Sequence, residues 1–250
     1  MRIPAPPCGG SVSASRPKRR ANPADDGCRM TTTTRSRIGA AALVAGALLF
    51  SLGDVLRRAV EPAGAASAAA TTAAVASHQA AWTAAASLQV LSAFFLVAGA
   101  CTAFGSTRGR GARTTDIGAC LVGAGAIASV GHAVAFYTPY SLFARAGTPE
   151  AALTAIDDAS ERLPVLALLV LTFMVGLMVG TLVLAVGTWR ARRAPAWVLV
   201  PAVAFVAAGA TSGTAAGLVG LVAAVVTFGL VARTIVREPA ERLDPAAVPA

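Results

Sequence analysis

Histidine and cysteine are scarce in this 250-residue chain, and their scarcity excludes several kinds of chemistry. There are 2 histidines and 4 cysteines. A haem held between transmembrane helices commonly needs an imidazole on each side, and no Cys/His cluster here has the spacing of a zinc site. The sequence contains neither His-Glu-x-x-His nor a glycine-rich phosphate loop followed by lysine. We therefore expect no cofactor, no bound metal and no enzymatic activity.

Long apolar runs dominate what is present: 56% of the residues are hydrophobic and only 13% are charged. A hydrocarbon core about 30 Å thick takes roughly 20 helical residues to cross. The runs predict an all-α fold, a polytopic integral membrane helix bundle with the lipid bilayer as its first partner. The six expected transmembrane helices span residues 38–56, 84–104, 117–138, 163–188, 195–211 and 214–232.

Two of the charge-free runs do not correspond to single spans. Residues 62–81 are nearly all Ala, Ser, Thr and Gly, which is too weakly hydrophobic for insertion. Residues 194–232 would form a helix nearly twice the bilayer thickness. We divide this second run at 209–217, where glycines and small polar residues interrupt the Val and Leu pattern.

Lysine is almost absent, and the arginines that replace it predict the orientation. The basic residues are 20 Arg and Lys18, a bias that, with abundant Ala and Gly, is typical of a high-GC bacterium. Seventeen of the 21 fall in 1–37, the second and fourth loops and the tail. Only four fall on the other side: Arg57, Arg58, Arg145 and Arg162. The positive-inside rule predicts the cytoplasmic (inner) membrane with both termini cytoplasmic. Because the charges are spread over separate loops, no nucleic-acid binding is expected.

The two ends of the chain are expected to be polar extensions of a single transmembrane domain. Residues 1–37 are expected to be a disordered, basic cytoplasmic segment, since 1–29 are rich in Pro, Gly, Ser and Arg. The residues from Met30 onward resemble an ordinary N-terminus. If translation begins at Met30, residues 1–29 result from an over-extended gene prediction. Residues 38–232 form the expected transmembrane domain, and 233–250 form a cytoplasmic tail.

An alternative for the first span is a signal peptide with Ala-x-Ala cleavage sites near residues 65–70. The charges of Asp54, Arg57 and Arg58 before those sites favour a retained span. Cleavage would leave five spans in the same orientation.

The cysteines lie on the wrong side for disulfide chemistry. Cys8 and Cys28 fall in the N-terminal segment, and Cys101 and Cys120 fall near the predicted cytoplasmic ends of spans two and three. A membrane disulfide oxidase needs paired thiols on the oxidising outer side. We expect Cys101 and Cys120 to be small packing residues, with an approach across the short hairpin as the alternative.

Three polar residues lie at one depth in the first three spans. At about 1.5 Å per helical residue, Asp54 lies about 24 Å from the inner edge, Gln89 about 8 Å below the outer edge, and His132 about 22 Å from the inner edge. Polar groups inside a span usually face the bundle interior or a water-filled cavity. One hypothesis is a site in which His132 exchanges protons, Asp54 polarises it and Gln89 orients a small polar solute.

Each of these residues also has a purely structural interpretation. Asp54 has Arg57 at i+3 and Arg58 at i+4, so a local ion pair satisfies it. Gln89 can form a hydrogen bond between helices. His132 can bond a neighbouring carbonyl or Tyr137.

Small residues indicate close helix packing in the second half of the chain. Two groups of glycines with four-residue spacing carry this prediction: Gly176 and Gly180, and then Gly209, Gly213 and Gly217. The contacts are expected within the monomer, with joining of subunits as the alternative. The function predicted first is that of a structural or accessory membrane protein that binds other membrane proteins or itself. The alternative is a small permease or proton-linked carrier with its polar site in the outer third of spans 1–3.

The third outer loop predicts a short surface helix. Thr148 is expected to cap it, with Pro149 in the first position and Glu150 in the first turn.

Overall fold

A computed structural model describes residues 23–61 and 67–241, and within these ranges it is helical with no strand. The elements in chain order are α1 (Pro23–Val60), α2 (Ala68–Ser77), α3 (Gln79–Ala103), α4 (Ala112–Ala146), α5 (Glu150–Glu161), α6 (Pro164–Met174), the π-helix η1 (Val175–Val179), α7 (Gly180–Arg190), the 3₁₀ helix η2 (Ala196–Val198), α8 (Leu199–Ala210) and α9 (Thr214–Glu241).

In the part of the chain that the structure describes, five helical rods are long and apolar enough to cross a membrane. They are Thr34–Val60, Gln79–Ala103, Ala112–Ala146, Pro164–Arg190 and Thr214–Arg237. The expected span 195–211 corresponds to the shorter apolar helix Ala196–Ala210. At about 1.5 Å per residue it is about 22 Å long, less than the hydrocarbon thickness of about 30 Å. The fold is that of a helical membrane bundle, and the count of six crossings stays a prediction.

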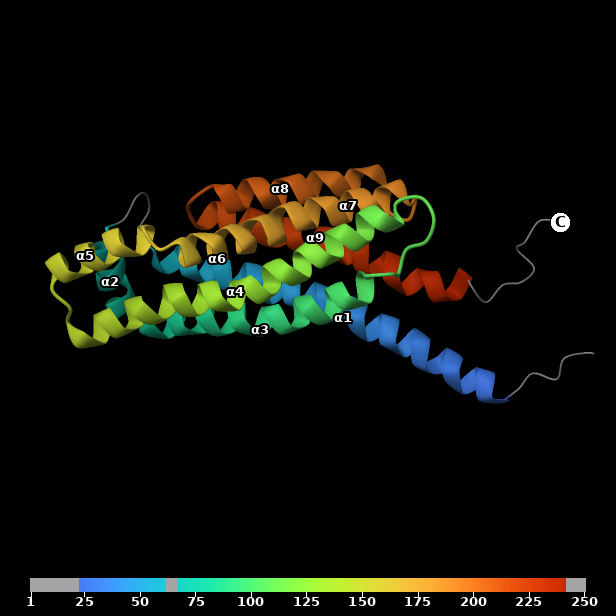
Figure 1. Cartoon of the computed structure of the whole chain (residues 1–250), viewed down its shortest axis with the longest axis horizontal. Helices are drawn as coiled ribbons and strands as arrows, with labels where there is room; N and C mark the ends of the chain where they lie inside the picture. Colours follow the sequence, from blue (N-terminus) through green and yellow to red (C-terminus); the bar gives the residue numbers. More distant parts are fainter. Residues whose placement is uncertain (1–22, 62–66, 242–250) are drawn as a thin grey trace, which may run out of the picture.

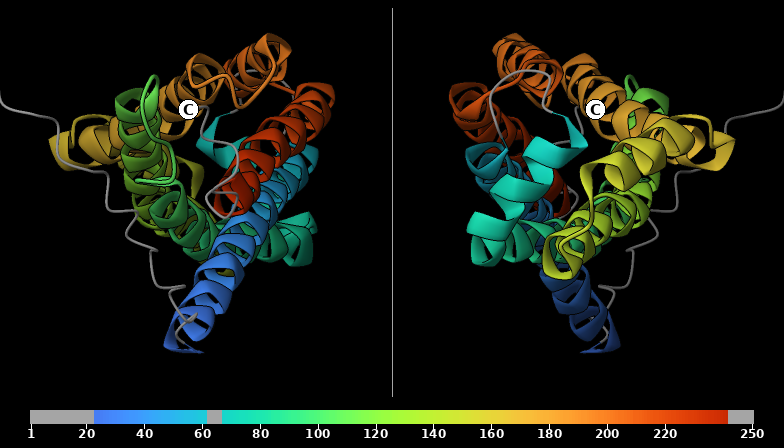
Figure 2. Two further views of the ribbon diagram at one scale, coloured as in Figure 1. Left: turned by 90° about the vertical axis from the view of Figure 1, so that its right-hand side faces the viewer. Right: turned by 90° about the vertical axis from the view of Figure 1, so that its left-hand side faces the viewer.

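The rods lie side by side along the long axis of the molecule, and the start of α1 and the end of α9 lie at the same end (Figure 1). We call this the terminal end. The opposite end, which carries α2 and α5, we call the α5 end. Viewed from there, α2 and α5 lie across the ends of the rods (Figure 2, right). The connections that contain Arg108 and Arg192 lie at the terminal end (Figure 1).

The first helix begins earlier than expected. Because α1 starts at Pro23, residues 23–37 are helical, and their predicted disorder is wrong. No proline or glycine interrupts the chain between Gly27 and Gly39, so nothing there ends the helix. Residues 233–241 of the expected tail likewise continue α9. The remaining parts of these two segments, 1–22 and 242–250, lie outside the described residues.

A row of glycines on α1 lets α3 approach closely. Gly39, Gly46 and Gly53 repeat every seven residues and face α3 along its length. A Cβ atom on Gly46 would lie 2.7 Å from the backbone nitrogen of Leu96, and one on Gly53 would lie 3.0 Å from the carbonyl oxygen of Ala85. A side chain at these positions would push the two backbones apart.

A second seam joins α4 to the rod formed by α6, η1 and α7. Gly176 lies against Gly125, and a Cβ on Gly180 would lie 2.8 Å from the backbone nitrogen of Val122. Gly118 faces the backbone of Leu184 in the same way. The predicted packing role of Gly176 and Gly180 is confirmed, and their contacts lie within the monomer.

The three glycines of the last hairpin have different roles. Gly209 faces the Met178 side chain, and a Cβ on Gly217 would lie 2.9 Å from Arg58 Cδ. Gly213 lies in the turn between α8 and α9 with φ 94°, and a Cβ there would meet nothing within 4 Å. Its predicted role in packing is wrong, because this turn needs a residue in the left-handed region.

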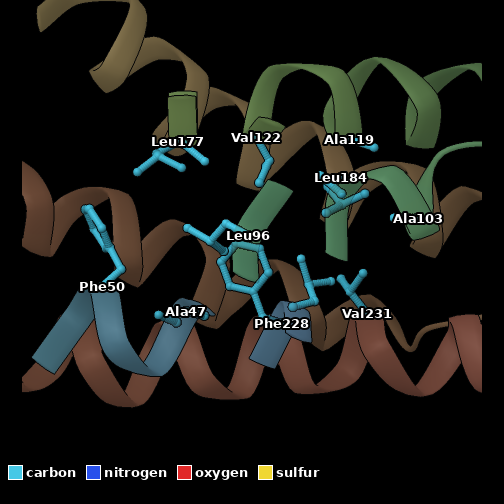
Figure 3. Packing of buried hydrophobic residues seen from close by; sticks show 14 of the residues in the cluster. Ala47, Phe50, Leu96, Ala103, Ala119, Val122, Leu177, Leu184, Phe228 and Val231 are labelled. Carbon is cyan, nitrogen blue, oxygen red and sulfur yellow. The ribbon is translucent and has the colours of Figure 1, made fainter. Parts of the chain in front are cut away.

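Fully buried aliphatic side chains fill the space between these seams. Leu96, Val122, Leu184 and Val231 converge there from four helices (Figure 3). A second cluster surrounds Trp82 at the α5 end, where the indole Nε1 donates a hydrogen bond to the Tyr137 carbonyl oxygen at 3.1 Å. The bundle is therefore packed on both sides of the layer that contains the predicted polar residues.

The expected surface helix is present as α5, Glu150–Glu161. Leu153 is buried against the bundle, while Ile156 is exposed. Pro149 occupies the cap position in an extended conformation, and no side chain caps the helix. The predicted capping by Thr148 is therefore wrong, because the helix starts one residue later than expected.

Candidate functional site

A cavity of about 230 Å³ lies inside the bundle, in the half toward the α5 end. All three predicted polar residues line it: Asp54 from α1, Gln89 from α3 and His132 from α4. We call it the central cavity. The rise per residue fixes the depth of each residue along its helix. Because neighbouring helices are antiparallel and aligned, these three residues of equal depth lie in one layer.

Asp54 is held by two arginines of its own helix. Its Oδ1 accepts a hydrogen bond from Arg57 Nη2 at 2.8 Å, and its Oδ2 accepts one from Arg58 Nε at 2.6 Å. Arg57 also forms an ion pair with Glu61. The local ion pair predicted for Asp54 is confirmed. Both carboxylate oxygens are engaged by arginine, so the hypothesis that Asp54 polarises His132 finds no support.

Arg58 connects this network to the last hairpin. Its guanidinium donates to the carbonyl oxygens of Ala208, at 3.2 Å, and Thr211. The hydroxyl of Thr214 in turn donates to the Arg58 carbonyl oxygen at 3.3 Å. A cation at the C-terminus of α8 adds donors to the last carbonyls of the helix and complements the helix dipole. The side chain of Arg58 is only 6% exposed, so this contact is shielded from solvent.

Among the described residues, two buried polar atoms on the cavity wall have no hydrogen-bond partner. These are Ser51 Oγ and Gln89 Oε1, in residues that are 4% and 5% exposed. The large majority of buried side-chain polar atoms are paired. The predicted hydrogen bond from Gln89 to a neighbouring helix is not formed by its amide oxygen. Both residues line the cavity, so its wall carries two polar atoms that no described protein group satisfies.

His132 is stacked between two aromatic rings. Its ring centroid lies 4.8 Å from that of Phe173 and 5.6 Å from that of Phe136, with interplanar angles of 16° and 17°. Within the described residues its imidazole forms no hydrogen bond, so the predicted bonds to a carbonyl or to Tyr137 are absent. The ring edge is left as a third polar group beside the cavity.

The remainder of the cavity wall is aromatic and methionine-rich. Phe50 and Phe173 meet edge to face at 6.0 Å, and Phe205 lines the wall from α8. Met174 and Met178 come from α6 and η1. The π-helical turn widens the rod at this depth, and such turns often occur at functional sites.

Two further cavities adjoin the central one at the α5 end. One, of about 450 Å³, lies beside the α8–α9 turn and shares Arg57, Arg58 and Gly209 with it. The other, of about 210 Å³, lies under α5 and shares His132 and Phe136. We call them the hairpin cavity and the α5 cavity.

Ser51 is the cavity residue that the sequence analysis missed, and Arg58 was considered only as an ion-pair partner of Asp54. Ser51, Asp54 and Arg58 stand at i, i+3 and i+7, so they share one face of α1. That spacing could have identified Ser51 once Asp54 was chosen.

Cys101 and Cys120 line none of the three cavities. Cys101 and Cys120 are free and exposed, so their predicted packing role is wrong. In the part of the chain that the structure describes, no three His, Cys, Asp or Glu side chains are grouped so that they could hold a metal ion.

The chain matches no protein-family model, and neither a curated protein nor a solved structure is significantly similar to it.

Proposed function

We propose that this protein is a non-catalytic membrane protein of the permease or carrier type that binds a small polar solute in the central cavity. The observation that carries the proposal is the pair of unpaired buried atoms, Ser51 Oγ and Gln89 Oε1, on the wall of one cavity. Leaving a buried polar group unpaired costs about 1–3 kcal/mol. A solute that pairs with both atoms would recover that free energy, which gives the bound state a specific advantage.

The surroundings of the cavity support entry from the α5 end. The hairpin cavity and the α5 cavity adjoin it there, through Arg58 on one side and His132 on the other. Toward the terminal end the glycine seams and fully buried side chains such as Leu184 close the bundle. In this state a solute would reach the site from one side only, and release to the other side would require the seams to separate.

The orientation follows from the arginines. We propose six crossings in the cytoplasmic membrane, with Ala196–Ala210 as a short fifth span and both termini in the cytoplasm. The terminal end, which carries most of the arginines, is then cytoplasmic by the positive-inside rule. The α5 end, with the three cavities, faces outward.

The structural or accessory function that the sequence favoured rests on glycine faces that would bind a partner. Gly176 and Gly180 instead pack against α4, and Gly217 packs against α1. These faces are occupied within the monomer, so we propose solute binding ahead of partner binding.

A cysteine at position 51 tests whether the cavity admits a small molecule. In a chain whose native cysteines are replaced by serine, Ser51→Cys is expected to react with methyl methanethiosulfonate in lipid nanodiscs, because the Ser51 side chain lines the cavity. The rate of modification is followed by mass spectrometry of the intact protein.

Ser129→Cys is the matched control. Ser129 is fully buried on α4, its hydroxyl bonds the Ala126 carbonyl oxygen at 2.7 Å, and it lines none of the three cavities. It should react much more slowly than the cysteine at 51. If both cysteines resist the reagent alike, the cavity is closed to solutes and the proposed function is wrong.

A further inference from the structure

We infer that the ligand of the central cavity is a small uncharged aromatic molecule with one hydroxyl group, such as a phenol or an aromatic alcohol. The inference rests on the proposed function and adds the chemical class of the solute. Three features of the cavity wall support it: its charges are already paired, its unpaired atoms need a neutral hydrogen-bonding group, and the rest of its wall is aromatic.

The charged groups at the cavity leave nothing for an ionic ligand. Asp54 is bonded by Arg57 and Arg58, and Arg57 also pairs with Glu61, so two carboxylates and two guanidinium groups balance within one network. The two terminal nitrogens of Arg58 also donate to the carbonyl oxygens of Ala208 and Thr211. An ion that entered would lose its hydration without gaining an opposite charge, which is strongly unfavourable in an apolar site.

The unpaired polar atoms match a hydroxyl group. The Gln89 side chain offers an amide, and Ser51 offers a hydroxyl that both donates and accepts. A ligand hydroxyl can donate to Gln89 Oε1 or accept from Ser51 Oγ. If the Gln89 amide is turned so that its NH₂ group faces the ligand, the ligand hydroxyl accepts a hydrogen bond from it, because a hydroxyl is both donor and acceptor.

The aromatic wall matches a ring. Phe50, Phe173 and Phe205 line the cavity with Met174 and Met178, and aromatic rings pack favourably against both types of side chain. A cavity of about 150 Å³ lined by apolar side chains can hold benzene. The central cavity, at about 230 Å³, has room for one ring and a short polar substituent but not for a drug-sized ligand.

The test compares four molecules that share one ring and differ in the polar group: benzyl alcohol, toluene, benzylamine and benzoate. Binding to the full chain in nanodiscs is measured at pH 7 by titration calorimetry, with empty nanodiscs as the background for partition into lipid. Benzyl alcohol is expected to bind saturably and about tenfold more tightly than toluene, the effect of roughly one well-formed hydrogen bond. The two ions are expected to bind more weakly than either.

Gln89→Leu supplies the decisive comparison. This variant should bind benzyl alcohol only as tightly as it binds toluene, and its affinity for toluene should be unchanged. Gln79→Leu is the matched control, the same substitution at the start of α3, where the side chain lines none of the three cavities. Ser51→Ala provides a second, smaller change in the same direction. Both cavity variants remove an unpaired buried polar atom, so they are expected to fold.

The outcomes separate this inference from the proposed function. Tighter binding of benzylamine or benzoate would show a charged ligand and overturn the inference alone. Equal binding of toluene and benzyl alcohol, unaffected by Gln89→Leu, would overturn the role of the hydroxyl. If none of the four binds while the cysteine at 51 is readily modified, the aromatic ligand class is wrong and the solute site stands. If that cysteine is not modified, the proposed function itself fails.

Discussion

Gly125→Ala is expected to destabilise the bundle by about 1–3 kcal/mol or more, although it adds a single methyl group. The new Cβ would lie 2.5 Å from the backbone nitrogen of Leu177 and 2.6 Å from the carbonyl carbon of Gly176. Both neighbours are backbone atoms of the π-helical turn, which cannot rotate away as a side chain could. The two helices would have to separate, and the contacts along the seam would be lost. The free energy of unfolding in detergent measures the effect.

Gly123→Ala is the control for this prediction. It lies on the same helix, but its Cβ would meet only Ala100 Cβ at 3.7 Å, an ordinary contact. Alanine is favoured over glycine in a helix by about 1 kcal/mol, so this variant should be neutral or stabilised. Equal losses at 123 and 125 would mean that glycine is needed for some reason other than the approach of η1. Equal tolerance would show that the seam is looser than described.

Arg58→Met is expected to be the most damaging change to a charged side chain. Removing one partner of a buried ion pair costs about 3–5 kcal/mol, and the Arg58 side chain is 6% exposed. We expect the lower end of that range, because Asp54 keeps Arg57 and is itself 24% exposed. The loss also removes the side-chain donor to the Thr211 carbonyl oxygen and one of several donors to the Ala208 carbonyl oxygen, which loosens the α8–α9 turn.

Two comparisons isolate the cause. Arg58→Lys keeps the charge but loses the planar fork that reaches the carboxylate and two carbonyls at once, so it should fall between wild type and Arg58→Met. Arg145→Met removes an exposed arginine at the same end and should change stability by less than about 0.5 kcal/mol. Thermal unfolding of the purified variants measures all three. A loss for Arg145→Met as large as that for Arg58→Met would indicate a general effect of charge.

The sequence predicted the polar layer but not the partners within it. Asp54, Gln89 and His132 could be assigned to one depth because the rise of a helix is constant. Their actual contacts depend on how each helix is rotated about its axis and on helices far away in the chain. The unpaired state of Gln89 and the stacking of His132 on Phe173 could not be read from spacing, because Phe173 lies on a helix whose position only packing decides.

The glycine rows also separate what the sequence predicts from what only packing decides. A repeat of seven residues at Gly39, Gly46 and Gly53 is visible in the sequence, whereas the predicted packing glycines have four-residue spacings. The structure adds which neighbour each row faces. Gly213 has the spacing of a packing residue but serves a turn, since only the backbone conformation distinguishes the two uses.

The sequence by itself determined that the chain forms apolar helices suited to a membrane, how they are spaced along the chain, and at what depth the polar side chains lie. These properties are local, because length, hydrophobicity and rise per residue belong to a single helix. Only the tertiary structure decided that Ser51, Gln89 and His132 line one cavity and that Arg58 caps α8. Those features depend on the rotation and neighbours of each helix, which are set by packing among all of them.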